Sequence, residues 1–465
     1  MEIFLKQGGS MATHEWGKGR IRLACLIGIV GLTLLAMGGC CKSDAPYSSP
    51  VATRTSTALI DAAKLKSWVD AGLVNSKRGE KVVILTITAA KDLYERGHIP
   101  GAIYVDPAEI VQTRIEAVAA SSTMVADGSK MDALIQRCGI DKNTTIVFTA
   151  PSSDPVYNAT RGYATFRYWG FPKERLKVLD GGDNGWKAVY VSTSATPIIA
   201  RSKYGVTPDG KNRVQATLRA SLGEMIAAVT NYDATKQAII DARSNDATGS
   251  YAGKPGSTVG VFAPNAGTPP VTTDYVVFEG HMKNAKAVPY TSLYDKDNAN
   301  RFFPPDDGTE TSLKSKFAAA GMDATKTAYV YCRTGYIASA EFFVLDGILG
   351  WNAVWYDGSW SQWGQMSASA ENEGKLPASA VWATDVPGLS ELVVYNFDQT
   401  VTISGTPTVL TMNHIEALPL DPISVSLFTT TSDPRANQIE TEDAAYKSPA
   451  ASGSAGPAGS GGGGC

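Results

Sequence analysis

Short apolar runs alternate with helix-length segments from about residue 58 to residue 196. Residues 81–85, 144–148 and 176–179 are rich in β-branched and aliphatic side chains and are predicted to be buried strands. Segments around 60–73, 128–138 and 156–169 are predicted to be helices. Because strands that are apolar throughout and separated by helices are typical of a parallel sheet covered on both faces, this half is expected to be an α/β domain.

The second half repeats this order of features. Its predicted strands are residues 238–240, 328–331 and 353–356. Each half also carries a Gly-His element between its first two strands, at His98 and at His281. We interpret the chain as a diverged tandem duplication of one α/β unit. The expected domains are 57–196 and 213–365, separated by a connector that contains Gly and Pro.

The remainder of the C-terminal part has a different pattern. Apolar and polar residues alternate around 391–395 and 401–403, which predicts a small β-rich extension over 366–431. From 432 to 465 the chain is polar and ends in a Gly/Ser stretch closed by Cys465. Such a composition buries too little apolar surface to order itself, so a flexible tail is expected.

The N-terminus has the parts of a secretory signal: basic residues up to Arg22, a mostly apolar run over 23–37, then small residues before Cys40. The run is too short for a confident membrane span, which needs about 20 apolar residues. Residues 1–39 are therefore expected to be a signal peptide, with Met11 as an alternative start. A plain signal peptide or an uncleaved anchor remains the alternative interpretation.

The residues before Cys40 resemble a bacterial lipobox. The resemblance implies acylation of Cys40, with residues 40–56 as a polar tether. By analogy with lipoprotein sorting, Cys41 after the acylated residue favours the outer membrane. The expected location is therefore an exported, lipid-anchored one, on the periplasmic or the surface face.

Composition excludes some classes of function. The chain has 465 residues, 43% of them hydrophobic and 19% charged, as in globular proteins of two or three domains. A net charge of −3 and the lack of a dense basic cluster argue against a nucleic-acid partner. Cys25 is expected to leave with the signal peptide and Cys40 to carry the lipid. The four remaining, scattered cysteines form no disulfide framework, and no Cys/His spacing suits a metal. No metal or other cofactor is expected.

Cys332 is the strongest candidate for chemistry. It stands at the carboxyl end of a predicted strand and is followed by a short loop and a helix, which is where open α/β sheets bind ligands. Amides of the loop and of the helix N-terminus are expected to point at the sulfur and to favour the nucleophilic thiolate. Gly335 allows the loop to turn back. The alternative is a small core cysteine.

Several motifs around Cys332 occur together in the order found in tandem-domain rhodaneses, the family of thiosulfate and mercaptopyruvate sulfurtransferases. The chain resembles that family through the Asp241-Ala242-Arg243-Ser244 motif, the stretch 251–254, the loop 332–337 and the closing stretches 349–351 and 356–363. In the first half, 97–102, 178–182 and Trp186 are similar as well.

The first half departs from the pattern at the decisive position. Its loop, 148–151, has no cysteine, and the Asp-x-Arg motif is replaced by Thr86-Ile87-Thr88. The resemblance implies a non-catalytic first domain that serves as a structural partner of the second.

The resemblance also implies a mechanism. Cys332 takes a sulfur from a small anionic donor such as thiosulfate, forms a persulfide, and passes the sulfur to cyanide or a thiol. Arg333 is expected to attract the donor, and the loop amides to hold the persulfide; the predicted binding residues are Arg333, Thr334, Gly335, Tyr336 and Ile337. Cysteine phosphatases need Cys-x5-Arg, and the position of that arginine is held here by Ala338, which disfavours phosphatase chemistry.

Other residues have simpler interpretations. Asp241 and Arg243 are expected to form a structural ion pair beneath the loop, His98 and His281 to hold turns, and Cys138 to lie in the core. Cys465 is either an inconsequential thiol or an accessory thiol that visits Cys332, since its tail of fifteen residues reaches about 20 Å.

Three kinds of function remain open. The leading hypothesis is a sulfurtransferase. The second is an envelope carrier of sulfur or selenium, or an accessory lipoprotein of a redox or electron-transfer complex, with an envelope redox protein as partner. The third is a structural lipoprotein that has lost its chemistry.

Overall fold

A computed structural model describes residues 58–116, 119–151, 156–206, 214–243, 281–367, 393–403, 406–416 and 437–446. The expected signal peptide, the tether with Cys40, and the end of the chain with Cys465 lie outside these residues. Within them, no helix combines the length and the apolar character needed to cross a membrane.

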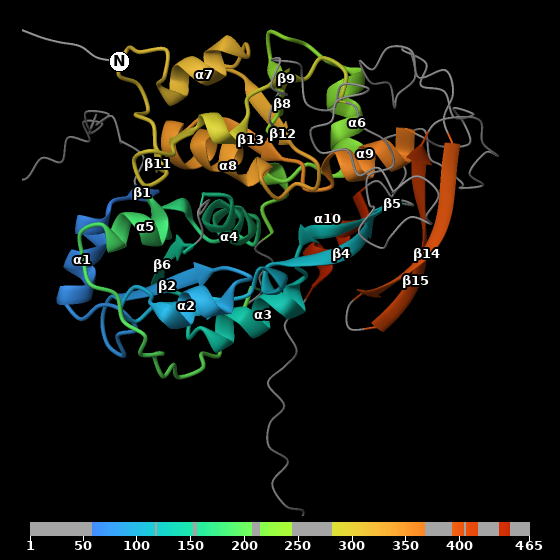
Figure 1. Ribbon diagram of the computed structural model, residues 1–465. Helices are drawn as coiled ribbons and strands as arrows, with labels where there is room; N and C mark the ends of the chain where they lie inside the picture. The colour runs from blue at the N-terminus through green and yellow to red at the C-terminus, as the bar shows by residue number, and fades with distance from the viewer. Residues whose placement is uncertain are drawn as a thin grey trace, which may run out of the picture. The chain divides into compact units, whose positions relative to one another are not determined.

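The first half contains a parallel sheet (Figure 1). Its strands lie in the order β1 (Leu59–Ile60), β7 (Leu176–Leu179), β6 (Thr144–Thr149), β2 (Lys81–Ile87) and β3 (Ile103–Val105). The strands predicted from the apolar runs are confirmed.

Side chains alternate across this sheet, so each face has its own core. Val82 and Ile84 pack with Leu65 of α1 (Ala62–Asp70) and Trp186 of α5 (Gly182–Lys187). Val83 and Leu85 point to the other face, against α3 (Gly128–Arg137) and α4 (Val156–Tyr168). Burial on both faces explains why these strands are apolar throughout. A short helix, α2 (Lys91–Arg96), precedes β3.

The second half repeats the arrangement. Its parallel sheet has the order β13 (Asn352–Trp355), β12 (Thr327–Tyr331), β8 (Gln237–Asp241) and β9 (Lys286–Ala287). This is the order of β7, β6, β2 and β3, which supports the interpretation as a duplication. The further elements of this half are α6 (Leu222–Thr230), β10 (Tyr294–Asp295), β11 (Arg301–Phe302), α7 (Leu313–Ala319), α8 (Ala338–Phe342), the π-helical stretch η6 (Phe343–Leu349) and α9 (Ser359–Ser367).

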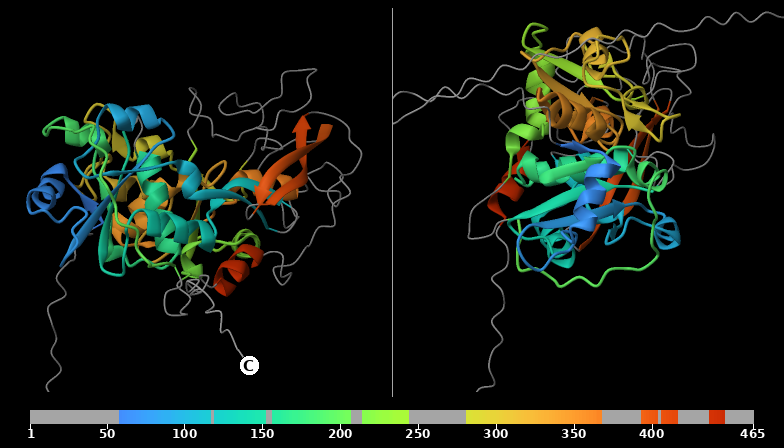
Figure 2. Two further views of the ribbon diagram at one scale, coloured as in Figure 1. Left: turned by 90° about the horizontal axis from the view of Figure 1, so that it is seen from below. Right: turned by 90° about the vertical axis from the view of Figure 1, so that its left-hand side faces the viewer.

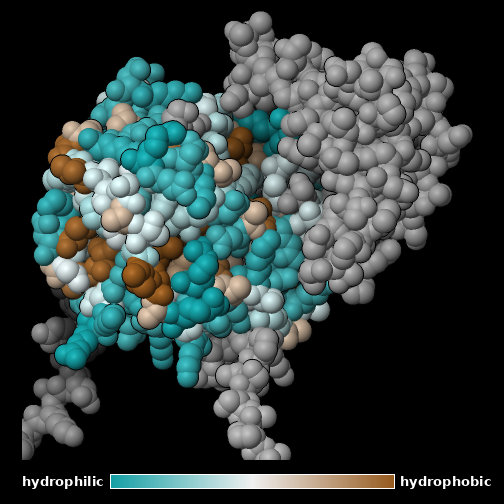
Figure 3. Space-filling view, turned by 60° about the horizontal axis from the view of Figure 1, so that its bottom comes forward, coloured by the Kyte–Doolittle hydropathy of each residue, from teal (hydrophilic) through white to brown (hydrophobic). Residues whose placement is uncertain are grey.

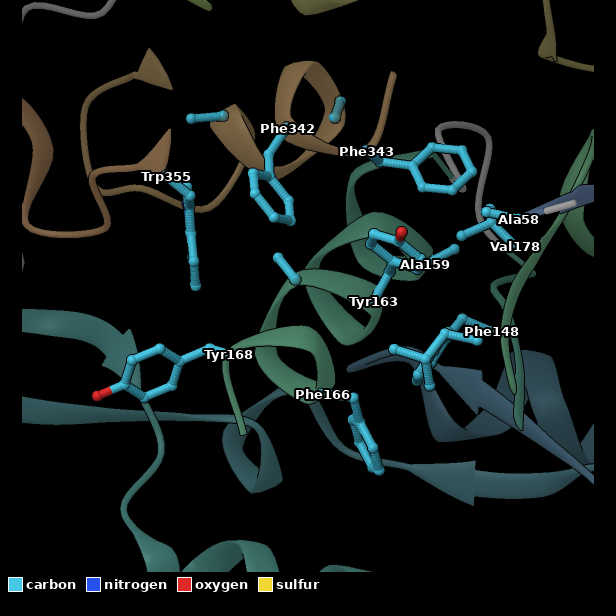
Figure 4. Close-up of a cluster of buried hydrophobic side chains, with 14 of the residues drawn as sticks. Ala58, Phe148, Ala159, Tyr163, Phe166, Tyr168, Val178, Phe342, Phe343 and Trp355 are labelled. Atoms are coloured by element: carbon cyan, nitrogen blue, oxygen red, sulfur yellow. The ribbon is translucent and has the colours of Figure 1, made fainter. Parts of the chain in front are cut away.

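Helices α4 and α8 lie between the two sheets and join the halves. Figure 4 shows Ala159 and Tyr163 on α4 directed toward Phe342 and Phe343, while Phe166 on the same helix is directed toward the first sheet. The rings of Tyr163 and Phe343 meet edge to face at 4.9 Å, and the Tyr163 hydroxyl donates to Asp346 at 2.6 Å. One hydrophobic cluster therefore runs from the first half into the second.

A β-hairpin that the sequence patterns did not predict extends from the first half to the second. It consists of β4 (Val111–Glu116) and β5 (Ala119–Val125). The Val125 amide donates to Asp357 Oδ2 at 2.7 Å, and the hydroxyls of Ser121 and Ser361 lie 3.2 Å apart. The hairpin thus belongs to the contact between the halves.

The described part of the C-terminal extension is an antiparallel hairpin of β14 (Val393–Ile403) and β15 (Thr406–Glu416). Its register pairs Val393 with Glu416 and Ile403 with Thr406. A small β-rich extension was expected here, and this hairpin lies within it.

The expectation of a flexible tail from residue 432 onward is wrong for residues 437–446. Residues Gln438–Ala445 form helix α10, shown in red against the body of the chain in Figure 2. Asp443 accepts hydrogen bonds from Arg114 at 2.7 Å and from the Tyr168 hydroxyl at 2.8 Å, and Ile439 is fully buried. The helix is held in place by buried polar contacts. For this reason the polar composition of the segment did not indicate that it forms a helix.

The C-terminal segment also contacts the second half. Arg219 donates to Glu440 at 3.3 Å, and Ser221 at the N-cap of α6 donates to Asn437 at 2.5 Å. Residues 437–446 therefore touch both halves of the chain.

Surface polarity follows the usual pattern. The face shown in Figure 3 is mostly hydrophilic, with hydrophobic residues in scattered groups. The large hydrophobic side chains that are exposed among the described residues lie in the connector after α5: Val189, Val191 and Ile198.

We predict that Asp443→Asn destabilises the fold by about 3 kcal/mol, because it leaves the buried Arg114 guanidinium without its close carboxylate. The matched control is Glu442→Gln. Glu442 also pairs with Arg114, but its side chain is 52% exposed whereas that of Asp443 is 2% exposed. The control should cost less than about 1 kcal/mol. Urea denaturation measures both; equal effects would contradict the role given to α10.

Candidate active site

Cys332 follows the last residue of β12 directly. Strand β12 pairs with β13 on one side and β8 on the other, so Cys332 lies at the carboxyl edge of an inner strand. The loop 332–337 then leads into α8, which begins at Ala338. This is the strand-loop-helix arrangement that the sequence predicted, and it is the usual ligand position in such sheets.

The loop curls around the sulfur. The N–H groups of Thr334 and Ala338 donate to the Cys332 sulfur, while the Cys332 amide itself donates to the Ser359 hydroxyl at 3.0 Å. Gly335 has a φ of +74°, and a Cβ there would lie 2.2 Å from the Asp357 carbonyl oxygen. Only glycine allows the loop to pass this close to the neighbouring backbone.

The environment of Cys332 corrects one expectation. The two amides lower the pKa of the thiol, as expected, but the residue is only 1% exposed and burial raises the pKa by more. The carboxyl groups of Asp241 and Glu341 raise the pKa further. The net shift of the pKa is upward, so burial favours the thiol over the thiolate at Cys332.

Asp241 and Arg243 form the ion pair that was expected beside the loop. Their side chains are 2.6 Å apart and are 1% and 4% exposed. The Arg243 guanidinium also lies over the rings of Tyr331 and Trp360. Because Arg243 is occupied in this way, its role in the described structure is to hold the end of β8 next to the end of β12.

Arg161 of the first half is a site residue that sequence reasoning missed. It lies on α4, fully buried, and donates to the Gly335 carbonyl at 3.0 Å and to the Thr123 carbonyl at 2.6 Å. Its guanidinium stacks on Trp355 at 4.2 Å. Burial lowers the pKa of Arg161 to about 10, so it remains a cation at neutral pH. Its interaction with Cys332 favours the charged forms of both groups.

The first half also holds the neighbouring loop residues. The Thr123 hydroxyl on β5 donates to the Thr334 carbonyl at 2.5 Å, and the Tyr336 hydroxyl donates to Asn158 on α4 at 2.9 Å. Arg333 and Ile337 are half-buried. The predicted binding loop is thus in place around Cys332, and its middle residues are fixed from the other half of the chain.

A buried charge network supports the backbone beneath Gly335. Asp357 Oδ1 accepts from Arg219 at 2.7 Å, and Arg219 also reaches Glu116 at 3.4 Å. All three side chains are fully buried. Their separation along the sequence gave no signal that they meet.

Strand register identifies the counterpart of Cys332 in the first half. Tyr331 pairs with Asp241 in the second sheet, and Thr149 pairs with Thr86 in the first. Ala150 therefore occupies the position of Cys332. Instead of a nucleophile, this region contains a hydrogen bond of 2.7 Å from Thr149 to the buried Asp183.

The other residues singled out in the sequence, His98, Cys138 and His281, were expected to have structural roles. His98 makes contacts with the carbonyls of Tyr94 at 2.9 Å and Ala195 at 3.3 Å. Cys138 is buried at the end of α3, where burial raises the pKa of its thiol to about 12. His281 is half-buried at the start of a described segment. Ser244 and the stretch 251–254 lie outside the described residues.

Across the described ranges, no group of three or more His, Cys, Asp or Glu side chains is arranged to hold a metal ion.

The family described as Rhodanese-like domain matches residues 70–189 and 226–366, together more than half of the chain. The chain belongs to the rhodanese-like domain family. The first match contains strands β2, β3, β6 and β7, and the second contains β8, β9, β12 and β13, so both halves are rhodanese-like domains and the predicted fold class is confirmed.

Two relatives span nearly the same two domains. A Mycobacterium bovis protein named "Putative thiosulfate sulfurtransferase 1" is 27% identical over 64% of this chain and 93% of its own length. A Mycobacterium leprae protein named "Putative thiosulfate sulfurtransferase SseA" is 29% identical over 62% of this chain and 84% of its own. A solved structure of EanB with hercynine, 16% identical, matches with a TM-score of 0.50 over 66% of this chain and 67% of its own; it shows the fold alone.

We predict that Arg161→Leu loosens the rhodanese loop without unfolding the protein. Removal of the guanidinium deletes donors to the Gly335 and Thr123 carbonyls, and hydrogen bonds to charged groups contribute about 1.5 to 3 kcal/mol. Hydrogen exchange of the amides of residues 334–337 should therefore become at least about tenfold faster.

The matched control is Arg175→Leu. Arg175 likewise donates to backbone carbonyls, of Thr144 and Asp141, but lies away from the loop. If both variants left the exchange of residues 334–337 unchanged, the loop would not depend on the first domain.

Proposed function

We propose that this protein is a sulfurtransferase that moves a sulfane sulfur from a small anionic donor such as thiosulfate, through a persulfide on Cys332, to a thiophilic acceptor such as cyanide or a thiol. Three observations support the proposal. The chain belongs to the rhodanese-like family, its two-domain relatives carry sulfurtransferase names, and Cys332 receives two loop amides at the carboxyl edge of its sheet. The last of these carries the proposal.

The first step forms the persulfide. The Cys332 thiol loses its proton to solvent, and the thiolate attacks the outer sulfur of thiosulfate. A new sulfur–sulfur bond forms on Cys332 as the sulfur–sulfur bond of the donor breaks, and sulfite leaves with the electron pair. The charge is −3 before and after the attack, and the outer sulfur of the persulfide retains one negative charge.

The second step returns the free cysteine. Cyanide attacks the outer sulfur, the bond between the two sulfurs breaks, and its electron pair stays on Cys332 as thiolate while thiocyanate leaves. A thiol acceptor reacts in the same way and leaves as a persulfide. No external oxidant or reductant is needed in either half of the cycle.

The residues around Cys332 have distinct tasks in this scheme. The amides of Thr334 and Ala338 stabilise negative charge on the sulfur. Arg333, which is half-buried in the loop, attracts the donor anion. Arg161 supplies a fixed positive charge and fixes the Gly335 carbonyl by a hydrogen bond. The first domain is therefore a non-catalytic partner that shapes the loop.

A second candidate function is supported by the burial of Cys332. A sulfur that is 1% exposed and whose pKa is raised reacts slowly, which suits a carrier that stores sulfur or selenium until a partner meets it. In this version the partner is a redox protein of the cell envelope. We also propose that the protein is exported and carries a lipid anchor on Cys40. This part of the proposal is supported by the sequence pattern alone.

We predict that incubation with thiosulfate adds one sulfur atom to the native protein and none to Cys332→Ser, as measured by intact mass. Cys138→Ser is the matched control, since Cys138 is a buried cysteine away from the loop. Repeated turnover with cyanide or a dithiol identifies the enzyme, and a single stoichiometric transfer identifies the carrier. A sulfur gain that survives Cys332→Ser would refute the assignment.

We also predict that persulfide formation accelerates with pH from about 7 to beyond 9. Because the pKa of Cys332 is raised above its ordinary value, the reactive thiolate is a minor form at neutral pH. Its fraction grows about tenfold per pH unit below the pKa. Single-turnover rates with thiosulfate measure this profile. A plateau reached by about pH 7 would mean that the amides outweigh burial.

A further inference from the structure

Ser359 holds a backbone conformation that residues with a side chain rarely adopt. Its φ is +52°, and the residue is fully buried. In this left-handed region the Cβ of an L-residue crowds the backbone, whereas glycine adopts it freely. A serine at this position keeps a strain that glycine would relieve, and such strain persists where the surrounding structure needs the side chain.

The first domain contains the matching position, and there it is a glycine. The pairings of β6 with β7 and of β12 with β13 place Gly182 at the position of Ser359. Each is the first residue of its helix, α5 or α9, and their φ angles are +53° and +52°. The next residue of each helix donates its amide, at 3.1 Å in both domains, to the carbonyl of Ala150 or of Cys332. The two backbones are therefore alike, and the side chain is the difference.

The hydroxyl of Ser359 joins the ends of two neighbouring strands. It accepts a hydrogen bond from the Cys332 amide, just after β12, at 3.0 Å, and donates to the Tyr356 carbonyl, just after β13, at 2.8 Å. A hydroxyl has one hydrogen, so the bond to Tyr356 leaves its oxygen as the acceptor for Cys332. These bonds differ from those of a helix cap, in which serine accepts from amides of its own helix. Gly182 has no side chain that could hold the amide of Ala150 in this way.

Helix α9 also fixes the first carbonyl groups of the loop. The Trp360 amide donates to the Cys332 carbonyl at 3.1 Å, and the Ser361 amide donates to the Arg333 carbonyl at 2.8 Å. Both backbone polar groups of Cys332 are thus bound by the start of α9. Fixed peptide groups on both sides of a residue set the direction of its Cα–Cβ bond, and this direction places the sulfur relative to the two loop amides that donate to it. Without the hydroxyl the Cys332 amide is a buried donor that must move to find a partner.

We propose that Ser359 is a positioning residue whose hydroxyl fixes the Cys332 amide and so keeps the sulfur in line with the loop amides that donate to it. The first domain, where Ala150 stands in place of the cysteine, has no sulfur to position and has glycine instead. No atom of Ser359 reacts, so the two transfer steps balance as written above. The role in sulfur transfer rests on the proposed function, but the effect on the thiol does not.

The test compares Ser359→Gly with Ser359→Ala in the full-length protein. Glycine removes the hydroxyl and adopts this backbone freely, as Gly182 does, whereas alanine removes the hydroxyl and keeps the strain. The matched control is Ser361→Ala. Ser361 is a buried serine of the same helix whose hydroxyl donates to the Gly358 carbonyl and lies next to that of Ser121.

The readout is the pH profile of iodoacetamide alkylation at Cys332, followed by mass spectrometry of the peptide that contains it. The midpoint of the profile reports the pKa of the thiol, and the plateau at high pH reports access to the sulfur, so a loop that only loosens raises the plateau alone. The charged groups that act on the thiol, Asp241, Glu341 and Arg161, are unchanged because all three substitutions are neutral. Circular dichroism and urea denaturation verify the fold of each variant.

We expect the midpoint to rise by about one pH unit in both Ser359 variants, because the loop amides no longer point at the sulfur. Below the midpoint this corresponds to alkylation that is about tenfold slower. Ser361→Ala should alkylate within about threefold of the native rate at each pH. Ser359→Gly should unfold at a urea concentration no lower than Ser359→Ala does, since glycine relieves the left-handed backbone.

An unchanged midpoint in Ser359→Gly, or an equal rise in Ser361→Ala, overturns the proposal. A glycine variant that does not fold overturns it as well, because the hydroxyl would then serve the fold; if only the alanine variant does not fold, the glycine variant decides. Alkylation needs no sulfur donor, so a midpoint that shifts as expected in a protein that gains no sulfur from thiosulfate would refute only the sulfurtransferase proposal.

Discussion

The carbonyl groups of the loop 332–337, which take their hydrogen bonds from side chains outside the loop, are the constraint on which this site depends. A loop whose amides turn inward to a sulfur must turn some of its carbonyl oxygens outward, and buried carbonyls need donors. The carbonyls of Thr334 and Gly335 find theirs on Thr123 and Arg161, both in the first domain, and on Trp355. The first domain, which lacks the cysteine, thus completes the backbone geometry of the loop that follows Cys332 in the second domain.

This dependence gives the duplication a physical meaning. The first domain has neither the cysteine nor the Asp-x-Arg motif, but its helix α4 and its hairpin β4–β5 contact the loop 332–337 of the second domain. The first domain also contributes the buried guanidinium group of Arg161, whose positive charge acts on Cys332. The packing that fixes the loop also buries Cys332. This burial disfavours the charged thiolate and raises the pKa of the thiol.

Much of the fold could be predicted from the sequence because strands buried on both faces leave continuous apolar runs, as at Val82–Leu85 and Ala328–Tyr331. The position of Cys332 could be found because a cysteine between a strand and a helix has a local sequence signature. Arg161 and the Arg219–Asp357 pair could not, since their roles arise from contacts between segments far apart in sequence. Helix α10 was missed because it is held by ion pairs, and the upward shift of the Cys332 pKa because the depth of burial has no local pattern.

Helix α10 makes the order of synthesis matter for this fold. Arg114 and its close partner Asp443 are separated by 329 positions, and Arg219 and Glu440 by 221. A nascent chain can form both sheets long before residue 437 is made, but it then holds two buried guanidinium groups that lack part of their counter-charge. Residues 437–446 therefore complete the charge pairing of two guanidinium groups, and a chain that stopped before residue 437 would leave the buried Arg114 without Glu442 and Asp443 although both sheets were complete.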